Sequence, residues 1–136
     1  MSYLARSNAE WVSFDQIRSN HKSNTYLICK ADNCSKLANE YSPIFNFSID
    51  ELKKRWDQMI AQTSNTALLY DENHSNHRIY VQYSKFWSFP DLIQVSFSSI
   101  HSGQSTIQLY SRSLLGYYDF DVNKIRLQKW LSAIKE

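Results

Sequence analysis

The segment LIQVSFSSIHSGQSTIQLYSRS, residues 92–113, decides the fold class. Apolar residues alternate with polar ones over residues 93–97 and again over residues 107–109. A period of two is typical of strands that bury one face. Gly103 lies between the two runs and can adopt the positive φ that hairpin turns require. The segment therefore predicts a pair of antiparallel strands.

Two segments before this hairpin also have the character of strands. Residues 66–72 (TALLYDE) and residues 78–85 (RIYVQYSK) are separated by the polar turn NHSNH. In the second segment Ile79, Val81 and Tyr83 alternate, and we expect them on the buried side. Four strands joined by loops predict an antiparallel meander. The opposite face is expected to be polar and almost uncharged, with Tyr80, Gln82, Gln94, Ser96, Ser98, Gln108, Tyr110 and Arg112.

Two other segments have the periodicity of amphipathic helices. Residues 47–62 begin with the capping-box pattern S-x-x-E at Ser48, and Trp56 belongs to their apolar face. In residues 123–136 the apolar positions recur at i, i+3, i+4 and i+7 and include Trp130. Both tryptophans are therefore expected in the core.

Together these elements predict an α+β fold. We expect a two-layer sandwich in which helices 48–62 and 122–135 cover one face of an antiparallel meander sheet of four or more strands. Residues 1–23 are expected to form an arm or short helix packed on the domain. Residues 24–136 are expected to form a single α+β domain, which agrees with a chain of 136 residues.

The composition argues against several classes of function. The chain is 43% hydrophobic and 15% aromatic, which is enough for a core without metals. A net charge of +2 gives no support for nucleic-acid binding, and the partner is expected to be a small molecule or a protein. We expect no transmembrane segment, because no run of about eighteen apolar residues occurs. The N-terminus lacks the apolar core of a signal peptide, so the expected location is cytoplasmic, with export by another route or after loss of a signal as the alternative.

No motif for a metal, a phosphate or a dinucleotide is recognisable, and we expect neither a metal nor a cofactor. Cys29 and Cys34 have the spacing C-x4-C without a second pair, which is atypical of structural zinc. Their sulfur atoms are expected to lie close together, and whether they bond depends on the redox compartment. His74 and His77 are interpreted as part of a polar turn.

Two stretches are candidates for a site. In the loop KFWSFPD, residues 85–91, the aromatic side chains form either a flap over the core or the lip of a pocket. Asn123 lies on the buried stripe of the last helix, where a polar side chain needs partners. It is expected to cap the helix or hold the turn around Gly116, or else to contact a ligand. Asp119 and Asp121 either form local ion pairs or do acid–base work.

Three functions follow from these candidates. The first is a non-catalytic binding module for a small apolar or extended ligand, or a peptide. A second is a protein-interaction module that uses the polar face of the sheet. A third is an enzyme that uses Asp119 with Arg112 or Tyr117. The candidate ligand-binding residues are Phe86, Trp87, Phe89, Arg112, Tyr117, Asp119 and Asn123.

Residues 111–126, SRSLLGYYDFDVNKIR, resemble the closing motif S-R-S-x-x-G-Y-[SY]-D-[LF]-G-V-N-[RK]-x-R of domain-of-unknown-function family 1499, an uncharacterised family of bacteria and plastids. Residues 24–34 and 86–97 resemble its N-x-Y-L-V-C-P-x-x-x-C and F-x-F-x-D-x-[VI] patterns. The resemblance covers about residues 24–131 and implies the fold rather than a chemistry. It also implies relatives that are often exported. Asp121 stands where the family prefers glycine, which argues against a tight positive-φ turn there.

Overall fold

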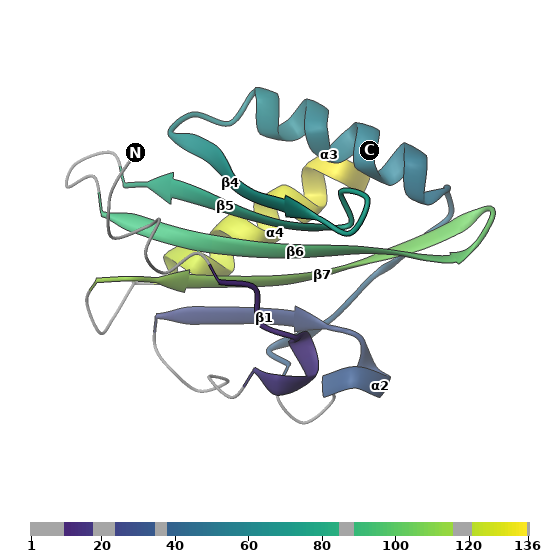
Figure 1. Cartoon of the computed structure of the whole chain (residues 1–136), viewed down its shortest axis with the longest axis horizontal. Helices are drawn as coiled ribbons and strands as arrows, with labels where there is room; N and C mark the ends of the chain where they lie inside the picture. The colour runs from purple at the N-terminus through teal and green to yellow at the C-terminus, as the bar shows by residue number, and fades with distance from the viewer. Residues whose placement is uncertain (1–9, 18–23, 35–37, 85–88, 116–120, 136) are drawn as a thin grey trace.

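The computed structural model describes residues 10–17, 24–34, 38–84, 89–115 and 121–135 (Figure 1). Within these residues the chain combines helices with one mixed sheet, so the α+β class is confirmed. The seven strands of the described part are β1 (Thr25–Cys29), β2 (Glu40–Tyr41), β3 (Ile44–Phe45), β4 (Thr66–Glu72), β5 (His77–Tyr83), β6 (Pro90–His101) and β7 (Gln104–Ser113).

The sheet has the order β2-β1-β7-β6-β5-β4, and β3 pairs with β7 beside β1. Strands β4 to β7 are antiparallel neighbours in chain order, as their alternating pattern predicts. β1 pairs with the other edge of β7 in the antiparallel sense, whereas β2 pairs with β1 in parallel. The expected antiparallel meander of four strands is thus present as β4 to β7, but the complete sheet is mixed. The two residues of β2 lie beside Ile28 and Cys29, the last two residues of β1, and run in the same direction.

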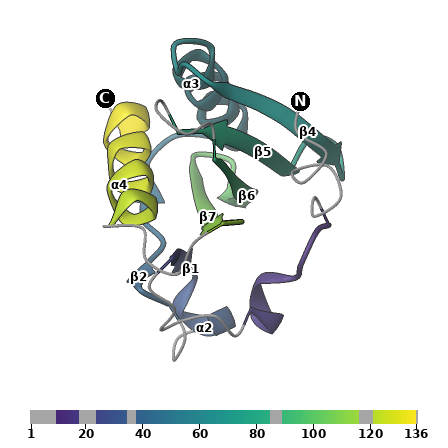
Figure 2. The ribbon, with the colours of Figure 1, turned by 90° about the vertical axis from the view of Figure 1, so that its left-hand side faces the viewer.

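The long helices α3 (Ile49–Ala61) and α4 (Val122–Lys135) lie on one side of the sheet, and the short helix η1 (Phe14–Gln16) lies on the other (Figure 2). α3 begins where its capping pattern predicts, because the Glu51 amide donates to Ser48 Oγ at 3.2 Å. Trp56 and Trp130 are both buried, with ring centroids 5.5 Å apart in an edge-to-face arrangement. The predicted helices and their buried tryptophans are confirmed.

The main core lies between these two helices and the sheet. It contains Ile28, Phe45, Leu52, Trp56, Tyr80, Ile93, Val95, Phe97, Ile107, Leu109, Leu127, Trp130, Leu131 and Ile134. The alternating apolar residues of β6 (Ile93, Val95 and Phe97) and of β7 (Ile107 and Leu109) thus face the helices, as predicted.

β5 has the opposite orientation to the predicted one. Tyr80 belongs to the helix-side core, while Ile79 and Val81 pack on the other face of the sheet. A tyrosine can be buried here because its hydroxyl is satisfied. Trp56 Nε1 donates to the Tyr80 hydroxyl at 2.9 Å, and Arg78 Nη1 donates to it at 3.2 Å. Burial raises the pKa of Tyr80, although these two donors oppose the shift.

Residues 10–17 cover a large part of the second face of the sheet. Phe14 and Ile17 pack in a cluster against that face. The Val12 amide donates to Gln94 Oε1 at 3.1 Å, and Gln94 Nε2 donates to the Val12 carbonyl at 2.5 Å. Part of the polar face predicted from the sequence is therefore covered. Its buried members are Gln94, Ser96, Gln108 and Tyr110.

Cys29 and Cys34 form a disulfide that joins β1 to the short helix α2 (Ala31–Cys34). Their Cα atoms are 6.1 Å apart, so the expected proximity is confirmed. Cys29 and Cys34 share the cluster that holds Phe14 and Ile17. No helix in the described part of the chain is long and apolar enough to span a membrane.

Candidate functional site

Polar side chains gather at one end of the sheet, on the side that faces α4. Strand pairing sets Gln82 of β5 beside Asp91 of β6, and Asp91 beside Ser113 of β7. Asn123 and Arg126 face them from α4, because residues three apart lie on the same side of a helix. We call this group the polar cluster; its members are Gln82, Asp91, Ser111, Ser113, Asn123 and Arg126.

Arg126 is the centre of the polar cluster, and only 8% of the residue is exposed. Its Nη2 donates to Asp91 Oδ2 at 2.6 Å in an ion pair, and its Nε donates to Gln82 Oε1 at 2.5 Å. Its Nη1 donates to Ser111 Oγ at 2.9 Å and to Asn123 Oδ1 at 2.8 Å. Four of the five N–H groups of this guanidinium thus have partners, and the fifth has none among the described residues.

The Asn123 side chain is fully buried. Its Nδ2 donates to the Asn24 carbonyl at 2.9 Å and to Ser113 Oγ at 3.0 Å. Its Oδ1 accepts from Arg126 and from Ser111 Oγ. Asn123 thus has the partners that a polar side chain on the buried stripe of the helix requires. These bonds fasten the first turn of α4 to β7 and to the residue that precedes β1.

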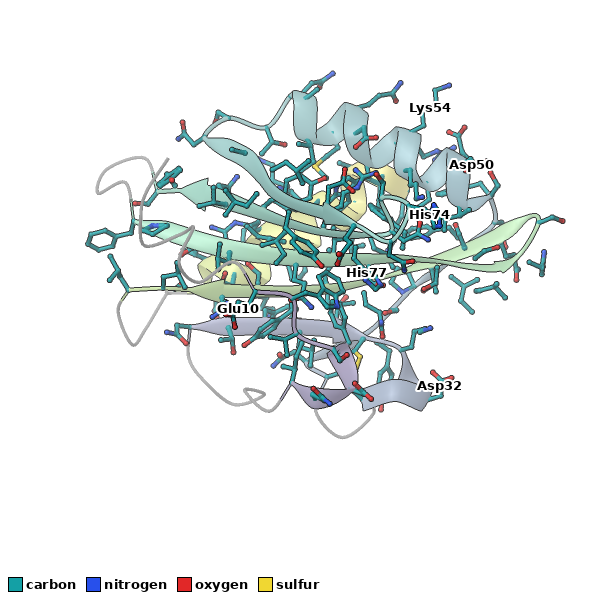
Figure 3. All side chains as sticks on the ribbon, in the orientation of Figure 1. Glu10, Asp32, Asp50, Lys54, His74 and His77 are labelled. Carbon is teal, nitrogen blue, oxygen red and sulfur yellow. A yellow bond between two sulfur atoms is a disulfide. The ribbon has the colours of Figure 1, made fainter. Side chains whose placement is uncertain are left out.

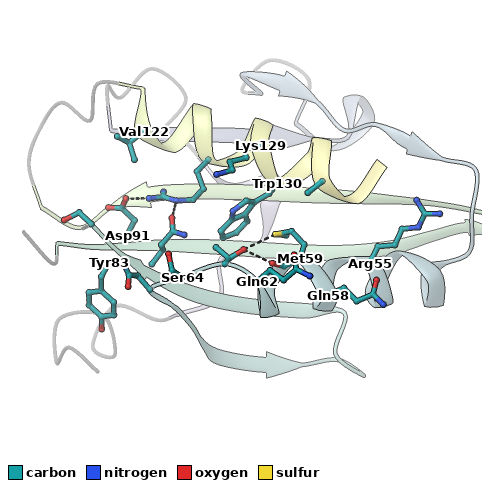
Figure 4. A pocket seen from close by; sticks show the side chains of 16 residues that line it. Arg55, Gln58, Met59, Gln62, Ser64, Tyr83, Asp91, Val122, Lys129 and Trp130 are labelled. Atoms are coloured by element: carbon teal, nitrogen blue, oxygen red, sulfur yellow. Dashed lines mark hydrogen bonds and ion pairs between the residues drawn. The ribbon is translucent and has the colours of Figure 1, made fainter. Parts of the chain in front are cut away.

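A cleft of about 690 Å³ opens between α3 and α4, beside the ends of β5 and β6 (Figure 4). Part of the polar cluster forms one wall, because Gln82, Asp91 and Arg126 line it. The other lining residues are Arg55, Gln58, Met59, Gln62, Thr63, Ser64, Asn65, Tyr83, Ser84, Val122, Lys129, Trp130 and Ala133.

Positive charge exceeds negative charge in the described lining of the cleft. Arg55, Arg126 and Lys129 are cationic, and Asp91 is the one carboxylate. Asp91 is paired with Arg126. Arg55 Nε pairs with Glu51 at 2.9 Å outside the lining. Lys129 makes no ion pair or hydrogen bond with a described residue. The cleft can therefore accept a negative group beside Lys129.

The sequence-predicted site residues do not converge in the described structure. Phe86, Trp87, Tyr117 and Asp119, together with Gly116, lie outside the described residues. Phe89 is 45% exposed, and its carbonyl accepts from the amide of Ser84, which lines the cleft.

Arg112 and Asn123 lie on opposite faces of the sheet. Arg112 pairs with Leu92 across β6 and β7, while the neighbouring Ser111 points to Asn123 on the helix side. Neighbouring residues of a strand point to opposite faces, so Arg112 does not join Asn123 in the polar cluster. The proposed ligand-binding group that includes both residues stays a prediction.

Sequence reasoning missed Arg126, Asp91 and Gln82. A signal for Arg126 was present, because it lies one turn before Trp130 on the buried stripe of the helix. A charged residue at such a position requires a partner of opposite charge. Asp91 is that partner, but nothing in the sequence links two residues from segments so far apart.

His74 and His77 lie at the hairpin between β4 and β5 (Figure 3). His77 stacks on Trp11, with ring centroids 4.2 Å apart and planes 9° apart. Within the described ranges, no group of three or more His, Cys, Asp or Glu side chains could hold a metal ion.

The fold and the polar cluster define an α+β protein with a ligand-sized cleft beneath its last helix. The family model described as "Protein of unknown function (DUF1499)" matches residues 23–134, and the chain belongs to this family. A comparison with curated proteins finds no match.

The family pattern now has a structural explanation in this chain. Ser111, Ser113, Asn123 and Arg126 are polar positions of the closing motif, and they meet in the polar cluster. Asp121 has a φ of 64°, so the expectation that its Cβ argues against a positive-φ turn is wrong. Aspartate tolerates this conformation better than most residues that carry a Cβ.

Proposed function

We propose that the protein is a non-catalytic binding module that holds a small molecule in the cleft between α3 and α4. The cleft itself is the observation that carries the proposal. Its volume of about 690 Å³ falls within the usual range for small-molecule sites. Arg126, Asp91 and Gln82 are fixed by their mutual hydrogen bonds, so this wall needs little rearrangement to bind.

The lining favours a ligand with polar groups over a purely apolar one. The amide side chains of Gln58 and Gln62 provide both donors and acceptors, and the hydroxyl group of Ser64 adds to them. An apolar molecule alone would leave such groups without partners and would bind less tightly. We therefore revise the expected apolar ligand toward one that also carries polar groups.

The two alternative functions have less support. The polar face of the sheet, which an interaction module would use, is partly covered by residues 10–17. An enzyme built on Asp119 would need Arg112 or Tyr117 nearby. Arg112 lies on the face of the sheet that faces away from the cleft. The described lining of the cleft holds no histidine or cysteine that could act as a base or a nucleophile.

The proposal is tested by comparing the binding of small fragments to the parent protein and to a variant whose cleft is filled by a tryptophan side chain. A library of polar fragments is screened by chemical-shift mapping on labelled protein. The same binders are then measured on Ala133→Trp, which places an indole in the lining of the cleft, and on Ser132→Trp, a neighbouring exposed position outside that lining. We expect fragment shifts at Met59, Gln62 and Trp130, with binding lost in the first variant and kept in the second. Shifts that map elsewhere, or equal binding by both variants, would contradict the proposal.

A further inference from the structure

The charges of the cleft are arranged along α4. Arg126 and Lys129 lie three residues apart on this helix, so their side chains emerge on the same side. Both line the cleft. Arg126 is held in place by Asp91, while Lys129 has no partner of opposite charge among the described residues. A negative group that enters the cleft would therefore find one unpaired cation.

Arg126 offers a second donor to the same group. Its guanidinium is immobilised by bonds to the polar cluster, and one of its N–H groups lacks a partner in the described part of the chain. Because Arg126 lines the cleft, a bound anion that accepts from this N–H would supply its missing partner. Hydrogen bonds from a charged donor to an anion are also stronger than neutral ones.

An apolar surface continues from these cations. Met59 of α3 and Trp130 and Ala133 of α4 line the cleft, and Val122 lines it at the other end of α4. Figure 4 shows Met59 and Trp130 facing each other across the space between the two helices. This surface suits the hydrocarbon part of a ligand, because it removes apolar area from water on both sides.

We infer that the ligand is an amphiphilic anion, with a carboxylate or a similar acidic head group at Lys129 and Arg126 and an apolar body between Met59 and Trp130. This inference rests on the proposed function, because it assigns the ligand class of the same cleft. It combines a polar head with the small apolar body expected from the sequence.

The test uses three probes that share one alkyl chain and differ only in the charge of the head group: octanoate, octanol and octylammonium. Binding is measured by chemical-shift titration of the full chain. We expect octanoate to bind about tenfold tighter than either of the others. The shifts should include the indole N–H of Trp130.

Lys129→Gln should weaken octanoate binding by about threefold to tenfold and leave octanol binding unchanged. Lys124→Gln is the matched control, because Lys124 is exposed on the same helix and does not line the cleft. Equal affinities for octanoate and octanol at the cleft would overturn the inference and leave the proposed function standing. Shifts outside the cleft, or no shift with any of the three probes, would also overturn it. The proposed function is judged separately, by polar fragments and Ala133→Trp.

Discussion

Asp121 is a residue with a Cβ in the left-handed region of backbone space, with φ 64° directly before α4. Its carbonyl accepts a hydrogen bond from the Ile125 amide at 2.9 Å, so Asp121 lies in this conformation at the start of α4. The helix could not start at the same place if φ returned to negative values. The positive φ therefore limits which residues are tolerated here.

Replacing Asp121 tests this conclusion. Asp121→Gly should leave the free energy of unfolding unchanged or raise it by up to about 1 kcal/mol, because glycine adopts positive φ without steric penalty. Asp121→Val should lower it by about 1–2 kcal/mol, because a β-branched residue is strained there. Urea unfolding measures both. If Asp121→Val is as stable as the parent, the positive φ does not matter to the fold.

Asn123 is fully buried, and its side chain joins β7, α4 and the chain before β1. Asn123→Ala should lower the free energy of unfolding by about 1–3 kcal/mol, because the Asn24 carbonyl and an Arg126 N–H lose their partner. The neighbouring exposed residue provides the control, and Lys124→Ala should change stability by less than about 0.5 kcal/mol. Equal unfolding midpoints for the two variants would show that the polar cluster is not structural.

At the scale of elements, residues 10–17 are attached to the sheet by ring stacking and side-chain hydrogen bonds as well as by the buried cluster of Phe14 and Ile17. Trp11 stacks on His77, and the Val12 backbone is bonded to the Gln94 side chain. Burial lowers the pKa of His77, while Glu72 opposes the shift. The Asn73 side chain also lies at 3.4 Å from His77 Nε2. Protonation of this imidazole is therefore disfavoured while Trp11 covers it.

Because the pKa of His77 is lower in the folded protein, its contribution to stability is present above the unfolded value near 6.5 and is lost as pH falls below it. We expect residues 10–17 to detach more often at pH 5.5 than at pH 7.5. Hydrogen exchange of the Val12 amide reports this, because that amide donates to Gln94. His77→Phe should keep the stack and remove the pH dependence.

His101→Gln serves as the control for this prediction, because His101 is exposed in the turn between β6 and β7. That variant should retain the pH dependence of Val12 exchange. The idea fails if His77→Phe and the parent respond to pH in the same way.

At the scale of the whole molecule, the sequence predicts what local patterns determine. The capping pattern at Ser48 places the start of α3, and alternation places β6 and β7. The orientation of β5 could not be predicted, because Ile79, Tyr80 and Val81 are all buried. A strand buried on both faces carries apolar residues at consecutive positions, so a period of two cannot distinguish its faces.

The parallel strand β2 and the cleft could not be predicted from the sequence either, for reasons that differ from the one given for β5. β2 has only two residues in the described structure, too few for a pattern. The cleft is formed by α3, the ends of β5 and β6, and α4, whose contributions are separated by long stretches of chain. Such a site depends on how helices pack on a finished sheet, and no short stretch of sequence records that packing.

Packing of the two helices on each other gives a prediction about the molecule as a whole. Trp56 and Trp130 contact each other edge to face, and both belong to the helix-side core. Trp56→Ala and Trp130→Ala should each lower the free energy of unfolding by about 3–5 kcal/mol. The double variant should lose less than the sum, by about 0.5–1.5 kcal/mol, because the aromatic contact is lost only once.

Trp11 belongs to residues 10–17 and lies on the face of the sheet that is away from α3 and α4. Pairing Trp11→Ala with Trp56→Ala should therefore give additive changes within about 0.5 kcal/mol, because the two rings have no stacking partner in common among the described residues. Urea unfolding of all variants measures both cycles, and Trp→Phe substitutions replace Trp→Ala where a variant does not fold. Additive effects of Trp56→Ala and Trp130→Ala would contradict the predicted coupling between these two rings. Coupling between Trp11→Ala and Trp56→Ala would mean that the sheet does not separate two independently packed faces.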